Sequence, residues 1–151
     1  CWDGGVLIGN SPDLLFFRDT DGDGQADEKH VVFTGFGSDK AGETHLNSIR
    51  WGIDHRFHIS TSMSGGEVKA VADPEAQPVS VRNRGIIFDP RDWTKFELTS
   101  GSGQHGMSMD DWGRKFVCSN SVPAQTLMYD DRYIARNPHV QAPPPAASSN
   151  V

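Results

Sequence analysis

Short apolar runs, separated by turn residues, recur along the whole chain. No stretch keeps a helical period of apolar positions over three turns, whereas apolar runs of strand length are frequent. We therefore expect strands within residues 5–10, 14–19, 30–35, 48–53, 56–62, 79–89, 96–100, 106–111, 115–120 and 125–130. This pattern predicts an all-β fold.

Three of the predicted hairpins share one order of residue types. The segments "WGIDHRFHIS", "IIFDPRDWTKFELT" and "MSMDDWGRKFVCS" each run from an apolar strand through an Asp-containing turn into an aromatic and apolar strand. Such a repeat is typical of β-propellers, in which a blade of four antiparallel strands takes roughly 40–50 residues. About three blades fit into this length, while closed propellers have roughly 4–8. We expect residues 1–138 to form about three blades of a larger propeller.

The end of the chain has a different composition. Residues 139–151 are rich in Pro and Ala and poor in large apolar side chains. This composition predicts an extended linker or a connection between blades, without packed structure of its own.

The net charge and the apolar content limit the kinds of partner that we expect for this chain. The net charge is -6 and the 14 Lys and Arg residues are scattered, so we expect no nucleic-acid partner, because phosphate binding needs clustered cations. No apolar run approaches the roughly 20 residues of a membrane helix, and none reads as a signal peptide. We expect no membrane insertion by this segment. Because Cys1 opens the chain inside an apparent strand, we also expect a longer parent chain.

The two cysteines leave two interpretations open. Cys1 and Cys118 form neither a CxxC motif nor a cluster with His, so these residues support neither zinc binding nor haem attachment. A disulfide between them would fit an oxidising compartment. Two buried thiols in strands are the alternative.

The segment "DTDGDGQADE" concentrates negative charge on one loop. The first, third, fifth, seventh and ninth positions, which supply calcium ligands in EF-hand loops, are Asp19, Asp21, Asp23, Gln25 and Asp27. Gln25 would contribute its backbone carbonyl, and Gly24 falls at the sharp turn. The twelfth position is His30 where an EF-hand has Glu, and no amphipathic helices flank the loop. We predict a structural calcium loop between two strands; a solvated acidic turn is the alternative.

Four segments together resemble a known family. "SPDLLFFRDTDGDGQADEKHVVFTGFG", "THLNSIRWGIDHRFH", "SGSGQHGMSMDDWGRKFVCSNS" and "RYIARNP" resemble the membrane-bound dehydrogenase domain of planctomycete-type bacteria. That family is similar to the glucose/sorbosone dehydrogenase quinoprotein propellers. The resemblance implies an exported protein, periplasmic or otherwise extracytoplasmic, with a six-bladed propeller. It also implies a cytochrome c domain as electron acceptor, its c-type haem lying elsewhere in the full-length protein.

The resemblance also suggests site residues. His45, at a strand entrance, matches the general base that takes a hydroxyl proton from a sugar while hydride passes to pyrroloquinoline quinone (PQQ). Where sugar-oxidising relatives often have an acidic residue before that His, this chain has Thr44. An Arg-Asn pair contacts the quinone in relatives; Arg82 and Asn83 are favoured over the competing "RNP" at Arg136.

Two more sets of histidines enter the prediction. His105 occupies an equivalent hairpin entrance one repeat later and is a second candidate to face the channel and the cofactor. His55 and His58 lie at or just after a hairpin turn, and we expect them to be exposed.

Two functions are compatible with these expectations. One is a calcium-stabilised, quinoprotein-like dehydrogenase that oxidises a sugar or polyol outside the cytoplasm. The alternative is a non-catalytic propeller that binds carbohydrate or a partner protein, because a fold alone does not establish activity.

Overall fold

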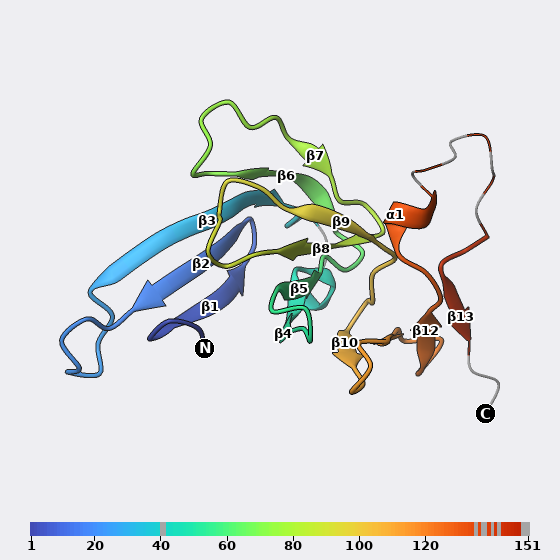
Figure 1. The fold of residues 1–151 in the computed structure, drawn as a ribbon, viewed down its shortest axis with the longest axis horizontal. Coiled ribbons are helices and arrows are strands. Elements are labelled where there is room, and N and C mark those ends of the chain that lie inside the picture. The colour runs from blue at the N-terminus through green and yellow to red at the C-terminus, as the bar shows by residue number, and fades with distance from the viewer. Residues whose placement is uncertain (40–41, 135, 137–138, 140, 142, 149–151) are drawn as a thin grey trace.

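The protein folds into antiparallel sheets. The structure, a computed structural model, describes residues 1–39, 42–134, 136, 139, 141 and 143–148. In these residues the strands β1 to β13 form three antiparallel sheets, accompanied only by the 3₁₀ turn η1 (Gly42–Thr44) and the short helix α1 (Asp131–Ile134). Figure 1 shows the sheets following one another in chain order, from β1 on the left to β13 on the right. The all-β prediction is confirmed.

The first sheet has five strands and the other two have four. In spatial order, the first contains β1 (Gly5–Asn10), β2 (Asp13–Arg18), β3 (Glu28–Phe36), β6 (Gly66–Ala70) and β7 (Val79–Ser80). The second contains β4 (Asn47–Trp51), β5 (Phe57–Ser60), β8 (Arg84–Phe88) and β9 (Glu97–Ser100). The third contains β10 (Gly106–Met109), β11 (Lys115–Cys118), β12 (Gln125–Leu127) and β13 (Ala146–Ser148).

Two strands, β6 and β13, fall outside the predicted runs. The hairpin of β6 and β7 leaves the chain between β5 and β8 but pairs with β3, which gives the first sheet its fifth strand. β13 pairs with β12, so residues 146–148 of the expected linker are a strand, because its backbone groups complete the third sheet. Residues 140, 142 and 149–151 of the expected linker lie outside the described residues.

The repeated Asp turns share one hydrogen-bonding scheme. Asp54, Asp89 and Asp110 each accept the backbone amide of the residue two positions later, at 3.3, 2.9 and 3.1 Å. Each also accepts the Nε–H of a following arginine, at 2.9, 2.8 and 2.6 Å, from Arg56, Arg91 and Arg114 respectively. A short carboxylate that bonds its own backbone two residues on stabilises a tight turn. The repeat seen in the sequence is therefore a repeat of local turn geometry.

The main hydrophobic core lies between the first two sheets. Phe33 of β3 packs edge-on against Phe88 of β8, with ring centroids 5.0 Å apart, and against Phe96 at 5.2 Å. The cluster comprises Leu14, Phe16, Val32, Phe33, Phe36, Leu46, Phe57, Ile59, Val68, Ala70, Val81, Ile86 and Phe88. The third sheet buries Met107 and Val117 outside this cluster. Phe33 therefore links the first sheet to the second.

Neither interpretation of the cysteines holds in full. Cys1 is exposed, Cys118 is half-buried, and both are free thiols. In the part of the chain that the structure describes, no helix has the length and apolar character needed to cross a membrane.

Candidate functional site

The predicted calcium loop joins β2 to β3 and protrudes at the left of Figure 1. Carboxylate oxygens of Asp19, Asp21 and Asp27 lie within 4.8 Å of one another. The amides of Gly22 and Gly24 donate to the two carboxylate oxygens of Asp19, at 2.7 and 2.9 Å. Both glycines have positive φ, +82° and +88°, where a side chain would be strained. The glycines thus let the loop turn back on its own carboxylates.

The fourth predicted carboxylate, Asp23, lies outside this cluster. The carboxylate of Asp23 accepts the backbone amide of Gln25 at 2.7 Å and its side-chain amide at 3.1 Å. Asp27 accepts both the backbone amide and the hydroxyl of Thr20 at 2.8 Å, and these bonds lower the pKa of Asp27 below its ordinary value. The loop itself therefore gathers three of the four predicted carboxylate ligands.

Four loop segments meet at the carboxyl end of β5: residues 44–47, 60–66, 81–84 and 102–105. We call them the loop cluster. Serine and threonine hydroxyls hold it together by donating to backbone carbonyls of neighbouring loops. Thr61 Oγ1 donates to Val81 O at 3.0 Å, and Ser62 Oγ donates to Gln104 O at 2.6 Å. Buried carbonyls need such donors.

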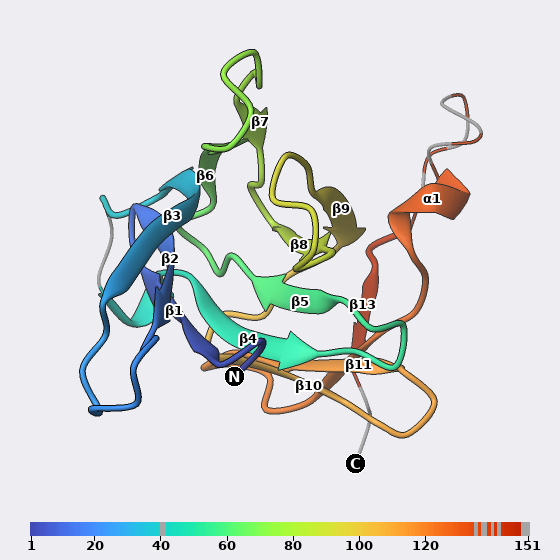
Figure 2. The same cartoon turned by 60° about the vertical axis from the view of Figure 1, so that its left-hand side comes forward.

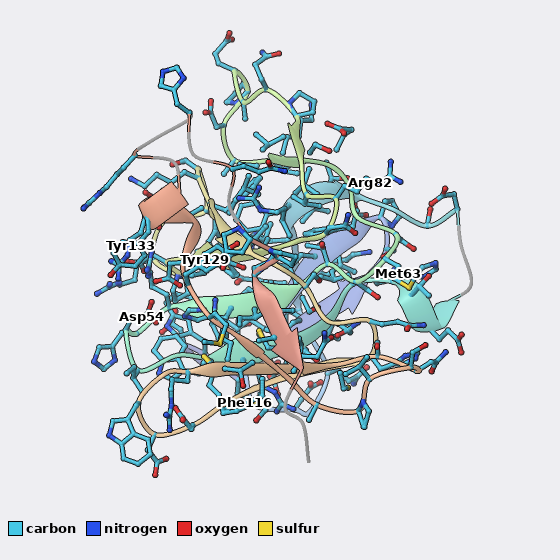
Figure 3. All side chains as sticks on the ribbon, turned by 90° about the vertical axis from the view of Figure 1, so that its right-hand side faces the viewer. Asp54, Met63, Arg82, Phe116, Tyr129 and Tyr133 are labelled. Atoms are coloured by element: carbon cyan, nitrogen blue, oxygen red, sulfur yellow. The ribbon has the colours of Figure 1, made fainter. Side chains whose placement is uncertain are left out.

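The loop cluster carries all four predicted catalytic and cofactor residues. Asn47 Nδ2 donates to the carbonyls of His45 and Gln104, at 3.0 and 3.1 Å, so the backbone of His45 lies beside that of His105. The turn that exposes Arg82 and Asn83 packs on residues 61–66, where a Cβ added to Gly65 would lie 2.9 Å from the Cα of Arg82. Figure 3 shows Arg82 and Met63 on the same side of the molecule.

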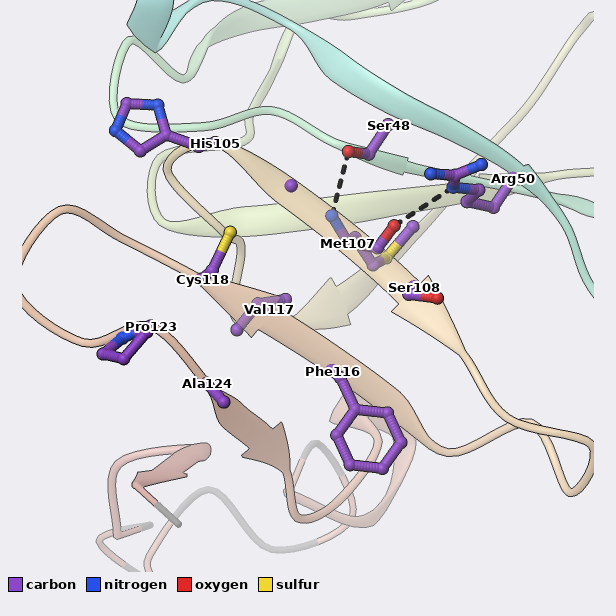
Figure 4. Close-up of a pocket in the computed structure, with 11 residues that line it drawn as sticks. Ser48, Arg50, His105, Met107, Ser108, Phe116, Val117, Cys118, Pro123 and Ala124 are labelled. Carbon is purple, nitrogen blue, oxygen red and sulfur yellow. Dashed lines mark hydrogen bonds between the residues drawn. The ribbon is translucent and has the colours of Figure 1, made fainter. Parts of the chain in front are cut away.

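A pocket of about 360 Å³ adjoins His105 (Figure 4). Ser48 and Arg50 of β4 form one wall, where they bond the backbone of Met107 at 2.9 and 3.1 Å. The imidazole of His105 is exposed, and its Nε2 lies 2.6 Å from Asn120 Oδ1. The pocket is lined by residues 48, 50, 105–108, 116–118, 123 and 124.

The structure thus separates the predicted set. His105 lines the pocket, whereas His45, Arg82 and Asn83 do not. Arg136, the competing arginine, lies over the ring of Tyr133 with its Cζ 5.9 Å from the centroid, outside the loop cluster.

A second pocket, of about 270 Å³, contains residues that the sequence did not identify. We call it the Lys115 pocket. It lies between the β4–β5 hairpin (residues 53–58) and the β10–β11 hairpin (residues 109–115), and Ile87, Asp130 and Arg132 complete it. In Figure 3, Asp54 marks this end of the molecule, away from Arg82 and Met63.

The prediction that His58 is exposed is wrong: only 7% of the residue is accessible. β5 is the inner strand between β4 and β8, and all four of its residues are buried. Because both of its faces are covered, alternation does not direct His58 to solvent. His55, at the tip of the turn, is exposed as expected.

His58 and Asp54 form a hydrogen-bonded pair, with Nε2 and Oδ1 2.9 Å apart. Burial raises the pKa of Asp54, but hydrogen bonds from His58 and Arg56 outweigh burial and leave that pKa below its ordinary value. Burial, followed by the charge of Lys115, lowers the pKa of His58. At neutral pH the pair is therefore an ionised carboxylate and a neutral imidazole.

Lys115 is also 7% accessible, although it is a charged residue on a strand. Burial lowers the pKa of its ammonium to about 8, while the charges of Asp130 and Asp54 act in the opposite direction. Hydrophobicity alone would place Phe116 inside and Lys115 outside on the strand "KFVC". The structure has the reverse.

These features define an all-β domain whose polar residues converge on loops at the strand ends. The chain belongs to the family described as "Domain of unknown function (DUF7133)", whose model matches residues 1–151. No curated protein and no solved structure matches the chain significantly.

Proposed function

We propose that this chain is part of the β-propeller of a quinoprotein-like dehydrogenase that oxidises a sugar or polyol. In this proposal each antiparallel sheet is a blade, and the loop cluster faces the central channel. The proposal is supported chiefly by one observation: segments distant in sequence bring His45, Arg82, Asn83 and His105 to the same end of β5. Clustered polar residues on loops of a rigid scaffold are typical of a binding site.

The residues present have chemistry that suits the quinone. Arg82 offers a guanidinium for the carboxylates of PQQ, and Asn83 offers an amide for its carbonyls. When bound, the quinone supplies the acceptor for hydride. His45 would accept the hydroxyl proton of the substrate, since the unprotonated nitrogen of a neutral imidazole can act as a general base. His105 would orient the substrate at the mouth of its pocket.

Calcium would be held by Asp19, Asp21 and Asp27, with Asp23 and the carbonyl of Gln25 completing the set after a local rearrangement. The ion would have a structural role, because the loop protrudes away from the loop cluster (Figures 1 and 2). Calcium modules of extracellular proteins bind with dissociation constants of about 10⁻⁴–10⁻³ M. Such a site fits the proposed periplasmic or otherwise extracytoplasmic location, with a cytochrome c domain as electron acceptor.

The proposal is tested by dye reduction with the full-length protein, PQQ and calcium over a panel of aldoses and polyols. A positioned general base contributes about 10²–10⁴-fold in rate, so His45→Ala should lower turnover by that factor. His55→Ala is the matched control, because His55 is exposed on a turn outside the loop cluster, and it should leave turnover unchanged. Equal rates for the two variants would reject the role of His45.

A non-catalytic propeller that binds carbohydrate or a partner protein is the second candidate. It is favoured by the exposure of Arg82 and Asn83 and by the engagement of the His105 imidazole with Asn120. Saturable binding to immobilised glycans, in a protein that neither binds PQQ nor reduces dye, would support this candidate over the dehydrogenase.

A further inference from the structure

Lys115 is turned inward on a strand that is not at a sheet edge. β11 lies between β10 and β12, with residues 115 and 117 buried and Phe116 exposed on the opposite face. Burying an ammonium without a contact partner is unfavourable, and a neutral or apolar residue would fit this position at lower cost. A cation that is buried on a strand and lines a pocket is a candidate for binding an anionic ligand.

The other cations of the Lys115 pocket are already paired. Arg56 contacts Asp54 at 2.9 Å and Glu97, outside the pocket, at 3.0 Å. Arg132 lies 3.4 Å from Asp130. Among the described residues, the ammonium of Lys115 has neither a hydrogen bond nor an ion pair. The carboxylates of this pocket are thus engaged by the arginines, and the charge of Lys115 lacks a contacting anion.

The buried histidine beside Lys115 does not supply that anion. Asp54 accepts from Nε2–H of His58, which leaves Nδ1 without a proton, and this buried Nδ1 has no hydrogen-bond partner. The backbone holds this arrangement closely, because a Cβ on Gly52 would lie 2.5 Å from Nε2 of His58 and 2.4 Å from Oδ1 of Asp54. The pair therefore has a fixed orientation.

The remaining walls of the pocket are apolar. Ile87 is buried, Met109 is half-buried, and Ile53 and Trp112 are exposed at the rim. A volume of about 270 Å³ corresponds to about nine water molecules at about 30 Å³ each. The space fits an organic molecule of about that number of non-hydrogen atoms, with one charged end.

We propose that the Lys115 pocket binds a small organic monocarboxylate, whose carboxylate contacts the ammonium of Lys115 and whose apolar part packs on Ile87, Met109 and Trp112. A single negative charge is favoured over the two of a phosphate monoester, because Asp54 and Asp130 line the same pocket and repel a second charge. The site lies at the opposite end of the molecule from the loop cluster, so the inference does not depend on the proposed dehydrogenase activity.

The test uses the 151-residue chain and three probes: benzoate, its neutral analogue benzamide, and inorganic phosphate. Benzoate should shift backbone NMR resonances of the two hairpins and bind at least about tenfold more tightly than the other two probes. Loss of a charge-assisted hydrogen bond weakens binding by about 10- to 100-fold, which is the effect expected for Lys115→Met. Lys69→Met, which removes an exposed lysine from strand β6, is the matched control and should change affinity less than about twofold.

A second measurement does not depend on the variant folding. In the wild-type chain, benzoate affinity should fall about tenfold or more between pH 7 and pH 9.5, as Lys115 loses its proton. The inference is overturned if no probe binds, if benzamide or phosphate binds as tightly as benzoate, or if affinity is indifferent both to Lys115→Met and to this pH change.

Discussion

An inward-pointing lysine lowers the stability of a fold for as long as it carries its charge. Burial lowers the pKa of Lys115 from 10.5 to about 8. The folded pKa is the lower one, so burial of Lys115 carries no charge penalty above about pH 10.5, where the amine is neutral in both states. The penalty grows as the pH falls from about 10.5 and is complete once the pH has fallen through about 8. Below that pH the cost is on the order of 3 kcal/mol.

We therefore predict that Lys115→Met raises the free energy of unfolding at pH 7 by about 1–3 kcal/mol. Met has a similar volume and needs no compensating charge. The gain should shrink towards zero as the pH approaches 10.5, and urea unfolding at several pH values measures it. Lys69→Met should show no such pH-dependent gain. A destabilised Lys115→Met at pH 7 would show that the burial of this charge is compensated within the fold.

The burial of His58 and Lys115 in the Lys115 pocket could not be predicted from the sequence. Burial of His58 follows from β5 being covered on both faces, which is a tertiary property with no local pattern. Lys115 points inward and Phe116 outward because of the register of β11 against β10. A shift of one residue would exchange the faces of these two side chains. Asp19, Asp21 and Asp27 could be predicted to meet, because their spacing on one short loop determines it.

At the scale of the elements, the strands were predictable wherever an apolar run lies between turn residues. β6 was missed because Val68 is its only large apolar residue and it follows a Gly-rich turn, so its apolar signal is weak. β13 was missed because Ala and Ser have low strand propensity. Its pairing depends on the open edge of β12, which only the tertiary fold provides.

The β2–β3 loop yields a second prediction at this scale, which depends on the proposed calcium site. Calcium at about 100 times its dissociation constant should stabilise the chain by about 2.7 kcal/mol, which is roughly 5–10 °C in Tm for a domain of this length. Chelation should remove that gain. Asp21→Ala should abolish it, because Asp21 belongs to the carboxylate cluster and Ala has no oxygen ligand to replace the carboxylate. Differential scanning calorimetry with calcium and with chelator measures both effects.

The control for this experiment is Glu28→Gln. Glu28 is a neighbouring acid that begins β3 and lies outside the carboxylate cluster. The Glu28→Gln variant should keep the full rise in Tm that calcium produces. If calcium leaves the Tm of the wild-type chain unchanged, the segment is an acidic turn closed by its own amides.

At the scale of the whole molecule, the two candidate sites lie at opposite ends of β5, with the core between them (Figure 3). The loop cluster follows Ser60, while the Asp54 turn precedes Phe57. A substitution in the hairpins of the Lys115 pocket therefore does not contact the loop cluster. The core cluster joins the first two sheets, and the third sheet docks on the second through polar bonds such as Ser48 to Met107.

Because the first two sheets share one core and the third sheet lies outside it, we predict that the first two sheets unfold together and that the third sheet can open separately. Phe33→Ala removes the ring that packs on both Phe88 and Phe96, and it should lower the free energy of unfolding by about 3–5 kcal/mol. Amide hydrogen exchange should then speed up together in β3, β5 and β8, because these strands share one core. Val117→Ala, in the third sheet, should speed up exchange in β10 to β12 and leave β3 and β8 protected, because regions with few apolar contacts open separately. Equal acceleration of all three sheets by Val117→Ala would instead mean that the hydrogen bonds from Ser48 and Arg50 to Met107 couple the third sheet fully to the core.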